Sequence, residues 1–135
     1  MKLFSVERVN ALIPRIAPLV DELLLKRRDL AIKLLESRTV GGVSQAGGVG
    51  LGAARLAEPR SPFPLPRFGD LKGDIIRLIQ RIESYGCILK DIDLGLLDFP
   101  SRLGDEPIYL CWKAGEPYVA YWHGLDEGLS ARKSL

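Results

Sequence analysis

The last third of the chain gathers most of the residue types that could do chemistry. Between Asp98 and Gly128 lie both tryptophans, the single histidine, one of the two cysteines and five acidic residues. Histidine exchanges a proton near neutral pH, and tryptophan and histidine both join an apolar body to a polar tip. This concentration predicts a ligand-binding site, whose candidate residues are Asp98, Trp122, His123, Asp126, Glu127 and Arg132.

Several of these residues are expected to meet at one end of a C-terminal sheet. Asp98 ends the first expected strand just before Pro100, which cannot extend a hydrogen-bonded ladder. His123 ends the third strand, which runs parallel to the first in an antiparallel meander, so both side chains lie at the same end. The sequence therefore predicts that Arg132 of the tail, with Asp126 or Glu127, joins Asp98 and His123. Glu116 lies in the turn at the opposite end and is expected to bind backbone amides there.

A metal site is the alternative interpretation. His123 could hold a metal ion with Asp126 or Glu127, since a helical turn brings residues three or four apart together. Such a site would support a small metal-assisted hydrolase with His123 as general base. Cys111 is not expected to contribute. With a turn at residues 114–116, Cys111 lies opposite a residue four positions before His123, roughly 13 Å away along the strand.

Two amphipathic helices precede this region. The first is expected over residues 6–38, with a bend near Pro14 and Pro18 because proline inside a helix removes a hydrogen bond. The second is expected over residues 70–85, with Gly86 as the left-handed residue after its end. Apolar residues repeat four and three positions apart in both helices, which predicts a long antiparallel helical hairpin.

Between and after the helices the pattern changes. Residues 39–69 are rich in glycine and proline and predict a flexible linker, because a phosphate-binding loop would need a preceding strand and a following helix. Residues 95–123 alternate with a period of two and predict a β-meander, with strands at 96–99, 107–113 and 117–123. A polar tail, residues 124–135, follows.

The predicted fold class is therefore α+β. A single domain, residues 1–135, combines the helical hairpin with a small three-stranded antiparallel sheet. In the middle strand Ile108, Leu110 and Trp112 share one face, which is expected to pack on the helices.

Three motifs near the C-terminus are distinctive in combination. They are Gly95-Leu-Leu-Asp-Phe-Pro, Leu110-Cys-Trp-Lys-Ala-Gly-Glu, and Trp122-His-Gly-Leu-Asp-Glu-Gly with Arg132. Together with Asn10-Ala-Leu-Ile-Pro, they resemble an uncharacterised prokaryotic family, the domain of unknown function 2203. That family is described with Gly-Phe after the acidic pair, where this chain has Gly128-Leu129. The resemblance covers nearly the whole chain outside the linker; it supports the fold and implies no activity.

The overall composition is typical of a soluble globular protein. Of the 135 residues, 47% are hydrophobic and 27% charged, and no apolar run approaches the roughly 20 residues of a membrane helix. No signal-peptide pattern is present at the N-terminus, so a cytoplasmic location with free thiols at Cys87 and Cys111 is expected. A net charge of +2 argues against nucleic-acid binding. Arginine outnumbers lysine by 12 to 7, and thermolabile residues are few, which favours a thermophilic source.

These features predict a non-enzymatic, self-associating module with a polar–aromatic site at the end of its sheet. Apolar side chains beside the main helical stripes need a second surface, which a homodimer through the helices would supply; they are Leu24, Leu25, Ala31, Leu35, Ile79 and Ile88. No cofactor and no membrane or nucleic-acid partner is expected. An unidentified small ligand or protein could occupy the site.

Overall fold

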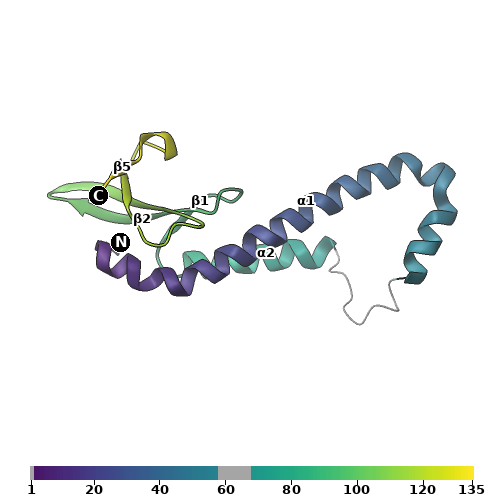
Figure 1. The fold of residues 1–135 in the computed structure, drawn as a ribbon, viewed down its shortest axis with the longest axis horizontal. Helices are drawn as coiled ribbons and strands as arrows, with labels where there is room; N and C mark the ends of the chain where they lie inside the picture. The colour runs from purple at the N-terminus through teal and green to yellow at the C-terminus, as the bar shows by residue number, and fades with distance from the viewer. Residues whose placement is uncertain (1, 58–67) are drawn as a thin grey trace.

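Two helices lie on one face of a five-stranded antiparallel sheet (Figure 1). The computed structural model describes residues 2–57 and 68–135, with side chains described at 2–37 and 70–135. In chain order the elements are α1 (Val6–Ala57), α2 (Phe68–Glu83), β1 (Ile88–Asp91), β2 (Leu96–Leu103), β3 (Glu106–Lys113), β4 (Tyr121–Gly124), the short 3₁₀ helix η2 (Leu129–Ala131) and β5 (Lys133–Ser134). The strands lie in the order β1-β2-β3-β4-β5. The α+β class is confirmed.

Helix α1 is longer than the sequence predicts. It continues through Pro14 and Pro18 as one α-helix, as the single predicted helix requires. Both prolines are exposed, and one helical turn separates them, so water can bind the carbonyl groups that they leave without a donor.

The predicted helix end at residue 38 is also wrong, because α1 reaches Ala57 and takes in the first part of the expected linker. No proline occurs from residue 19 to residue 58, and glycine weakens a helix without removing a donor. Of the rest of the expected linker, residues 58–67 lie outside the described residues, and residues 68 and 69 form the start of α2, two residues before the predicted start.

Helix α2 runs antiparallel to α1 beside its first half (Figure 1). Its buried side chains are Leu71, Ile75, Leu78 and Ile82, and the facing stripe of α1 is Val9, Ile13, Ile16, Val20 and Leu23. The helix ends at Glu83, two residues before the predicted end, and Gly86 has the expected positive φ of +106°. A side chain at Gly86 would meet the ring of Phe4, with 2.8 Å between a Cβ and Cζ. The chain therefore reverses at Gly86, next to the core.

The sheet has five strands, so the prediction of three strands is wrong. Strand β1 was not predicted, because apolar residues, including Leu89 and Ile92, continue the helical spacing of α2 beyond its end. Strand β5 is only two residues long and pairs with β4, with Ser134 opposite Tyr121. The inner face of β3 carries Ile108, Leu110 and Trp112, and all three belong to the core cluster with the helices, as predicted.

Strand β4 begins later than predicted, at Tyr121. The backbone N–H of Val119 donates to Asn10 Oδ1 of α1 at 2.8 Å, so this residue bonds to a helix. Trp112 Nε1–H donates to the Glu116 carbonyl oxygen at 2.8 Å, which closes the preceding turn. Residues 114–120 thus form a longer connection, and Tyr109 lies opposite His123 while Cys111 lies opposite Tyr121.

Two of the apolar residues that were expected to need a second surface are instead packed against the core of the same chain. Leu24 and Ile79 are half-buried and pack against the core cluster. Leu25, Ala31 and Leu35 are exposed, and Ile88 is half-buried. Among the described residues, no helix is long and apolar enough to cross a membrane.

Gly95 permits a close contact between the sheet and α1. Its φ is +65°, and an added Cβ would lie 2.8 Å from both Ala114 Cβ and Val20 Cγ1. Gly104 has a similar φ of +62° but no atom within 4 Å of an added Cβ.

We expect Gly104→Ala to cost about 1–2 kcal/mol for the left-handed conformation alone. Gly95→Ala should cost about 1–3 kcal/mol more, because the core is overpacked. Urea unfolding of both variants measures the difference, and equal losses would contradict the close contact.

Candidate functional site

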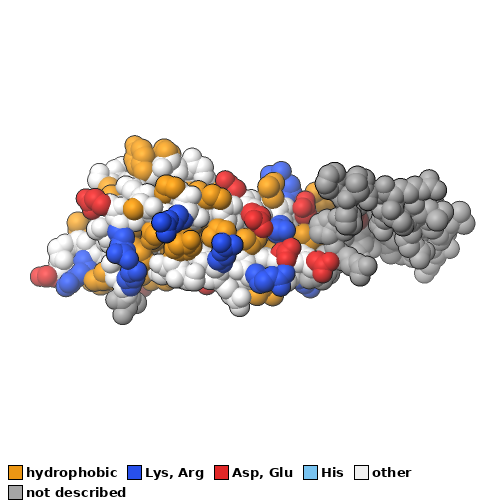
Figure 2. Space-filling view, turned by 90° about the horizontal axis from the view of Figure 1, so that it is seen from below, with side chains coloured by type: hydrophobic (Ala, Val, Ile, Leu, Met, Phe, Trp, Pro, Cys, Tyr) orange, Lys and Arg blue, Asp and Glu red, His pale blue; other side chains and the backbone are white. Residues whose placement is uncertain are grey.

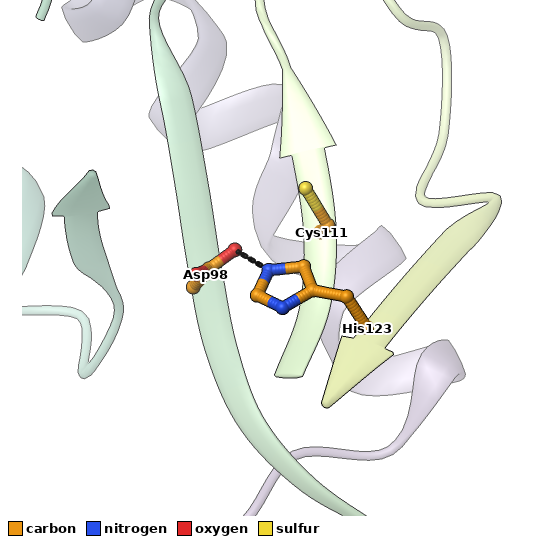
Figure 3. Close-up of side chains that lie close together, drawn as sticks. All are labelled: Asp98, Cys111 and His123. Carbon is orange, nitrogen blue, oxygen red and sulfur yellow. Dashed lines mark hydrogen bonds and ion pairs between the residues drawn. The ribbon is translucent and has the colours of Figure 1, made fainter. Parts of the chain in front are cut away.

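Three buried polar side chains meet on the face of the sheet that points away from the helices (Figure 3). Asp98 of β2, Cys111 of β3 and His123 of β4 are 1%, 0% and 2% exposed, respectively. Each offers one ligand atom, and these atoms all lie within 4.8 Å of one another. Asp98 lies opposite Cys111 in the ladder, and His123 lies diagonally across from Cys111 on the next strand. We call these three residues the buried cluster.

The proximity of Cys111 and His123 corrects the sequence analysis, which placed them far apart. That prediction assumed a turn confined to residues 114–116. Because the connection is longer, the pairing of β4 with β3 differs by two residues from the predicted pairing. His123 therefore lies opposite Tyr109. Since side chains alternate with a period of two, the shift leaves both residues on one face and brings them together.

The hydrogen bonds of His123 indicate which of its ring nitrogens carry a hydrogen. Nδ1 lies 2.7 Å from the Gly124 carbonyl oxygen, which can only accept, so Nδ1 carries a hydrogen. Nε2 lies 2.9 Å from Asp98 Oδ1. Nε2 therefore donates a second hydrogen to the carboxylate, or it accepts one from a protonated Asp98. In both cases one proton is shared between the two side chains.

The surroundings of the cluster keep Cys111 protonated. Burial, followed by the negative charge of Asp98, raises the pKa of the Cys111 thiol to about 11. A thiol of this kind is a poor nucleophile at neutral pH. The ring centroid of Tyr109 lies 5.6 Å from that of His123, and Lys90 Nζ lies 5.2 Å from the Tyr109 ring centroid. The Tyr109 ring thus lies beside His123.

Arg132 binds Glu116 and the backbone of Cys111, and the hydrogen bonds of the described residues do not join it to Asp98 or His123, with which it was predicted to group. Arg132 Nη2 donates to Glu116 Oε1 at 2.6 Å and to the Cys111 carbonyl oxygen at 3.2 Å. The guanidinium carbon lies 4.1 Å from the ring centroid of Tyr121, so the side chain lies along that ring toward the turn. The other part of the prediction is confirmed, because Glu116 Oε1 also accepts from the Lys113 amide at 2.6 Å.

The remaining candidates lie outside the buried cluster. Glu127 Oε1 accepts from the Gly124 amide at 2.7 Å and from Lys133 Nζ at 3.0 Å, and Asp126 is exposed. Trp122 lies on the opposite face, half-buried against the core. In the described part of the chain, the metal set predicted from His123, Asp126 and Glu127 does not come together.

The buried cluster could not be found by searching for residues close in sequence. Asp98, Cys111 and His123 are separated by 12 residues or more, and only the register of three strands joins them. The sequence analysis placed Asp98 at the end of its strand, before Pro100, and this is wrong, because β2 continues through Pro100 to Leu103. The predicted proximity of Asp98 and His123 is nevertheless confirmed. Cys111 was missed because its register depends on the bond between Val119 and Asn10.

Replacing Asp98 tests how much the buried pair contributes to stability. Asp98→Ala leaves a buried histidine nitrogen without its partner, so we expect a loss of about 3–5 kcal/mol in the free energy of unfolding. In Asp98→Asn the amide N–H can donate to Nε2 of a neutral imidazole, so the loss should be only about 1 kcal/mol. Denaturant unfolding of both variants provides the measurement. Equal losses would show that the hydrogen bond to Nε2 is not the stabilising contact.

Glu127 gives a pH-dependent contribution to stability. The Gly124 amide, followed by the Lys133 ammonium, holds the pKa of the Glu127 carboxyl below its usual range. A group with a lowered folded pKa stabilises the fold above its unfolded pKa, and this contribution is lost as the pH falls through the folded pKa. We expect Glu127→Gln to be less stable than wild type at neutral pH. The free energies of unfolding of the two proteins should converge at acid pH. A difference that does not change with pH would exclude a role for the charge of Glu127.

Comparison with known proteins tests the resemblance inferred from the C-terminal motifs. No curated protein and no solved structure matches the chain. A family model described as "Uncharacterized conserved protein (DUF2203)" matches residues 2–135, a range that includes the entire buried cluster. The predicted resemblance is therefore confirmed, and the chain belongs to the DUF2203 family.

Proposed function

We propose that this protein is a self-associating module in which α1 pairs two copies of the chain. Its sheet presents the polar site around His123 on the side away from the helices. The observation that carries the proposal is the length of α1 relative to the elements that cover it. Pairing through α1 would leave the outer face of the sheet uncovered by the partner, because that face points away from the helices.

Helix α1 extends well beyond α2 (Figure 1). It has 52 residues and α2 has 16, which correspond to lengths of about 78 Å and about 24 Å at a rise of 1.5 Å per residue. A helix that projects into water gains little stability from its own hydrogen bonds, since tertiary packing supplies most helix stability in proteins. Packing on a second chain would supply it here.

Exposed apolar side chains on the helices provide a surface for such packing. Leu25 and Ile32 are 58% and 45% exposed and, seven residues apart, share one face of α1. Ile76 of α2 is also exposed. Figure 2 looks onto the helical side and shows hydrophobic side chains in groups between cationic and anionic ones. A mixed surface of this kind suits association with another folded chain.

A second copy is the occupant that the charges favour. Around Ile32 the exposed or half-buried charged residues are Arg28, Asp29, Lys33 and Glu36, two of each sign. Two identical surfaces with balanced charge can meet without net repulsion, and most oligomers form by such two-fold pairing of one patch with itself. The apolar residues of one copy would then meet those of the other.

Sedimentation velocity of the full chain tests the proposal. We expect a dimer at micromolar concentration and a shift to monomer in the variant Leu25→Asp/Ile32→Asp. Leu103→Asp is the matched control, because Leu103 is 50% exposed at the end of β2, away from the helices, and should not change the assembly. Circular dichroism verifies that all variants are folded. A wild-type monomer at tens of micromolar would overturn the proposal.

A further inference from the structure

We infer that Asp98, Cys111 and His123 form a binding site for one divalent transition-metal ion of the zinc class. This inference concerns the face of the sheet opposite α1 and does not depend on self-association. The cluster combines a carboxylate oxygen, a sulfur and an imidazole nitrogen, all from different strands. Zinc and similar ions take ligands of these three kinds, whereas magnesium and calcium prefer oxygen alone.

The distances between the donor atoms are close to those that a metal needs. Ligand bonds of 2.0–2.3 Å in a tetrahedral arrangement place donors about 3.3–3.8 Å apart. The three atoms here all lie within 4.8 Å of one another, with His123 Nε2 and Asp98 Oδ1 at 2.9 Å. Small rotations of the side chains would therefore accommodate an ion. The rigid β2–β3–β4 ladder fixes the backbone positions from which the three side chains project.

His123 is already oriented as a metal ligand. Its Nδ1–H donates to the Gly124 carbonyl oxygen at 2.7 Å, so Nε2 is the nitrogen that faces Asp98 and Cys111. Metal-ligating histidines usually make this type of outer hydrogen bond, which fixes the tautomer and the ring orientation. Without metal, one hydrogen joins Nε2 and Asp98 Oδ1, and with metal the ion would take its place among the ligand atoms.

Charge balance favours a divalent ion at this buried position. A thiolate, a carboxylate and a neutral imidazole carry a total charge of −2, which a divalent cation neutralises. The metal site would thus be electrically neutral inside a cluster whose members are at most 2% exposed. Binding exchanges the ion for two protons, the thiol proton of Cys111 and the proton shared by Asp98 and His123. Three side chains supply three ligands, and water can take the fourth position of a tetrahedral site.

Cobalt titration of the full chain tests the site, because Co²⁺ reports its ligands through its absorption spectrum. We expect one equivalent to bind, with a thiolate-to-cobalt charge-transfer band. Cys111→Ser should abolish the band and weaken binding at least tenfold, while it leaves the Asp98–His123 hydrogen bond in place. Cys87→Ser is the matched control. Cys87 is also buried, but its Sγ contacts the Ile82 carbonyl oxygen and lies outside the cluster, so the band should be unchanged.

Asp98→Asn supplies a second variant in case Cys111→Ser does not fold. Its amide can hydrogen-bond to His123, but it removes the anionic ligand, so we expect weaker cobalt binding in a folded protein. The inference is overturned if wild type binds no cobalt, or if either cluster variant binds it as well as wild type does. It is also overturned if the band depends on Cys87. Sedimentation with and without a chelator separates this outcome from the self-association proposal, since the dimer should persist without metal.

Discussion

A hydrogen bond between Val119 and Asn10 joins the chain before β4 to α1 and limits how β4 can pair with β3. The Val119 amide donates to a side chain of α1 that is 109 residues earlier in the sequence. While that amide is bound to the helix, residue 119 cannot pair with β3, and the next strand starts at Tyr121. The register of β4 on β3 follows, and with it the position of every side chain on β4.

This register gives the two faces of the sheet different chemical characters. The inner face places Leu110 and Trp112 against the helices in a continuous apolar core. The outer face brings Asp98, Cys111 and His123 together, and all three are buried. Polar groups buried in this way must be satisfied, and the Gly124 carbonyl oxygen and the shared proton satisfy both nitrogens of the imidazole. The outer face thus combines buried polar residues with a defined hydrogen-bond geometry.

The helices and the sheet make separate contributions to the molecule. Helix α2 covers one part of α1 and completes the core beneath the sheet, while the rest of α1 extends away from it (Figure 1). Gly95, whose missing side chain allows Val20 and Ala114 to approach, joins the sheet closely to α1. The exposed residues Leu25 and Ile32 lie on α1, whereas the buried cluster lies on the face of the sheet that points away from the helices. A partner on α1 and an ion in the sheet could therefore bind at the same time.

Several features could be predicted because they depend on local periodicity and backbone chemistry. The α+β class, the apolar stripe of α2, the positive φ of Gly86 and the inward face of β3 all follow from spacing and residue type. The adjacency of Asp98 and His123 also followed, because strands one and three of any antiparallel meander run parallel. The family motifs lie in the same segments, where the residue types are most distinctive.

The residues that join Asp98 and His123 depend on contacts between parts of the chain that are far apart in the sequence. Cys111 enters the cluster because a contact between residues 10 and 119 sets the strand register, and no local pattern encodes such a contact. Arg132 reaches Glu116 because the two-residue strand β5 carries it alongside Tyr121. β1 and β5 were missed for a related reason: one continues the periodicity of a helix, and the other is too short to have a period. Long-range hydrogen bonds therefore fixed the chemistry of this site, since side-chain alternation turns a small change in register into a different set of neighbours.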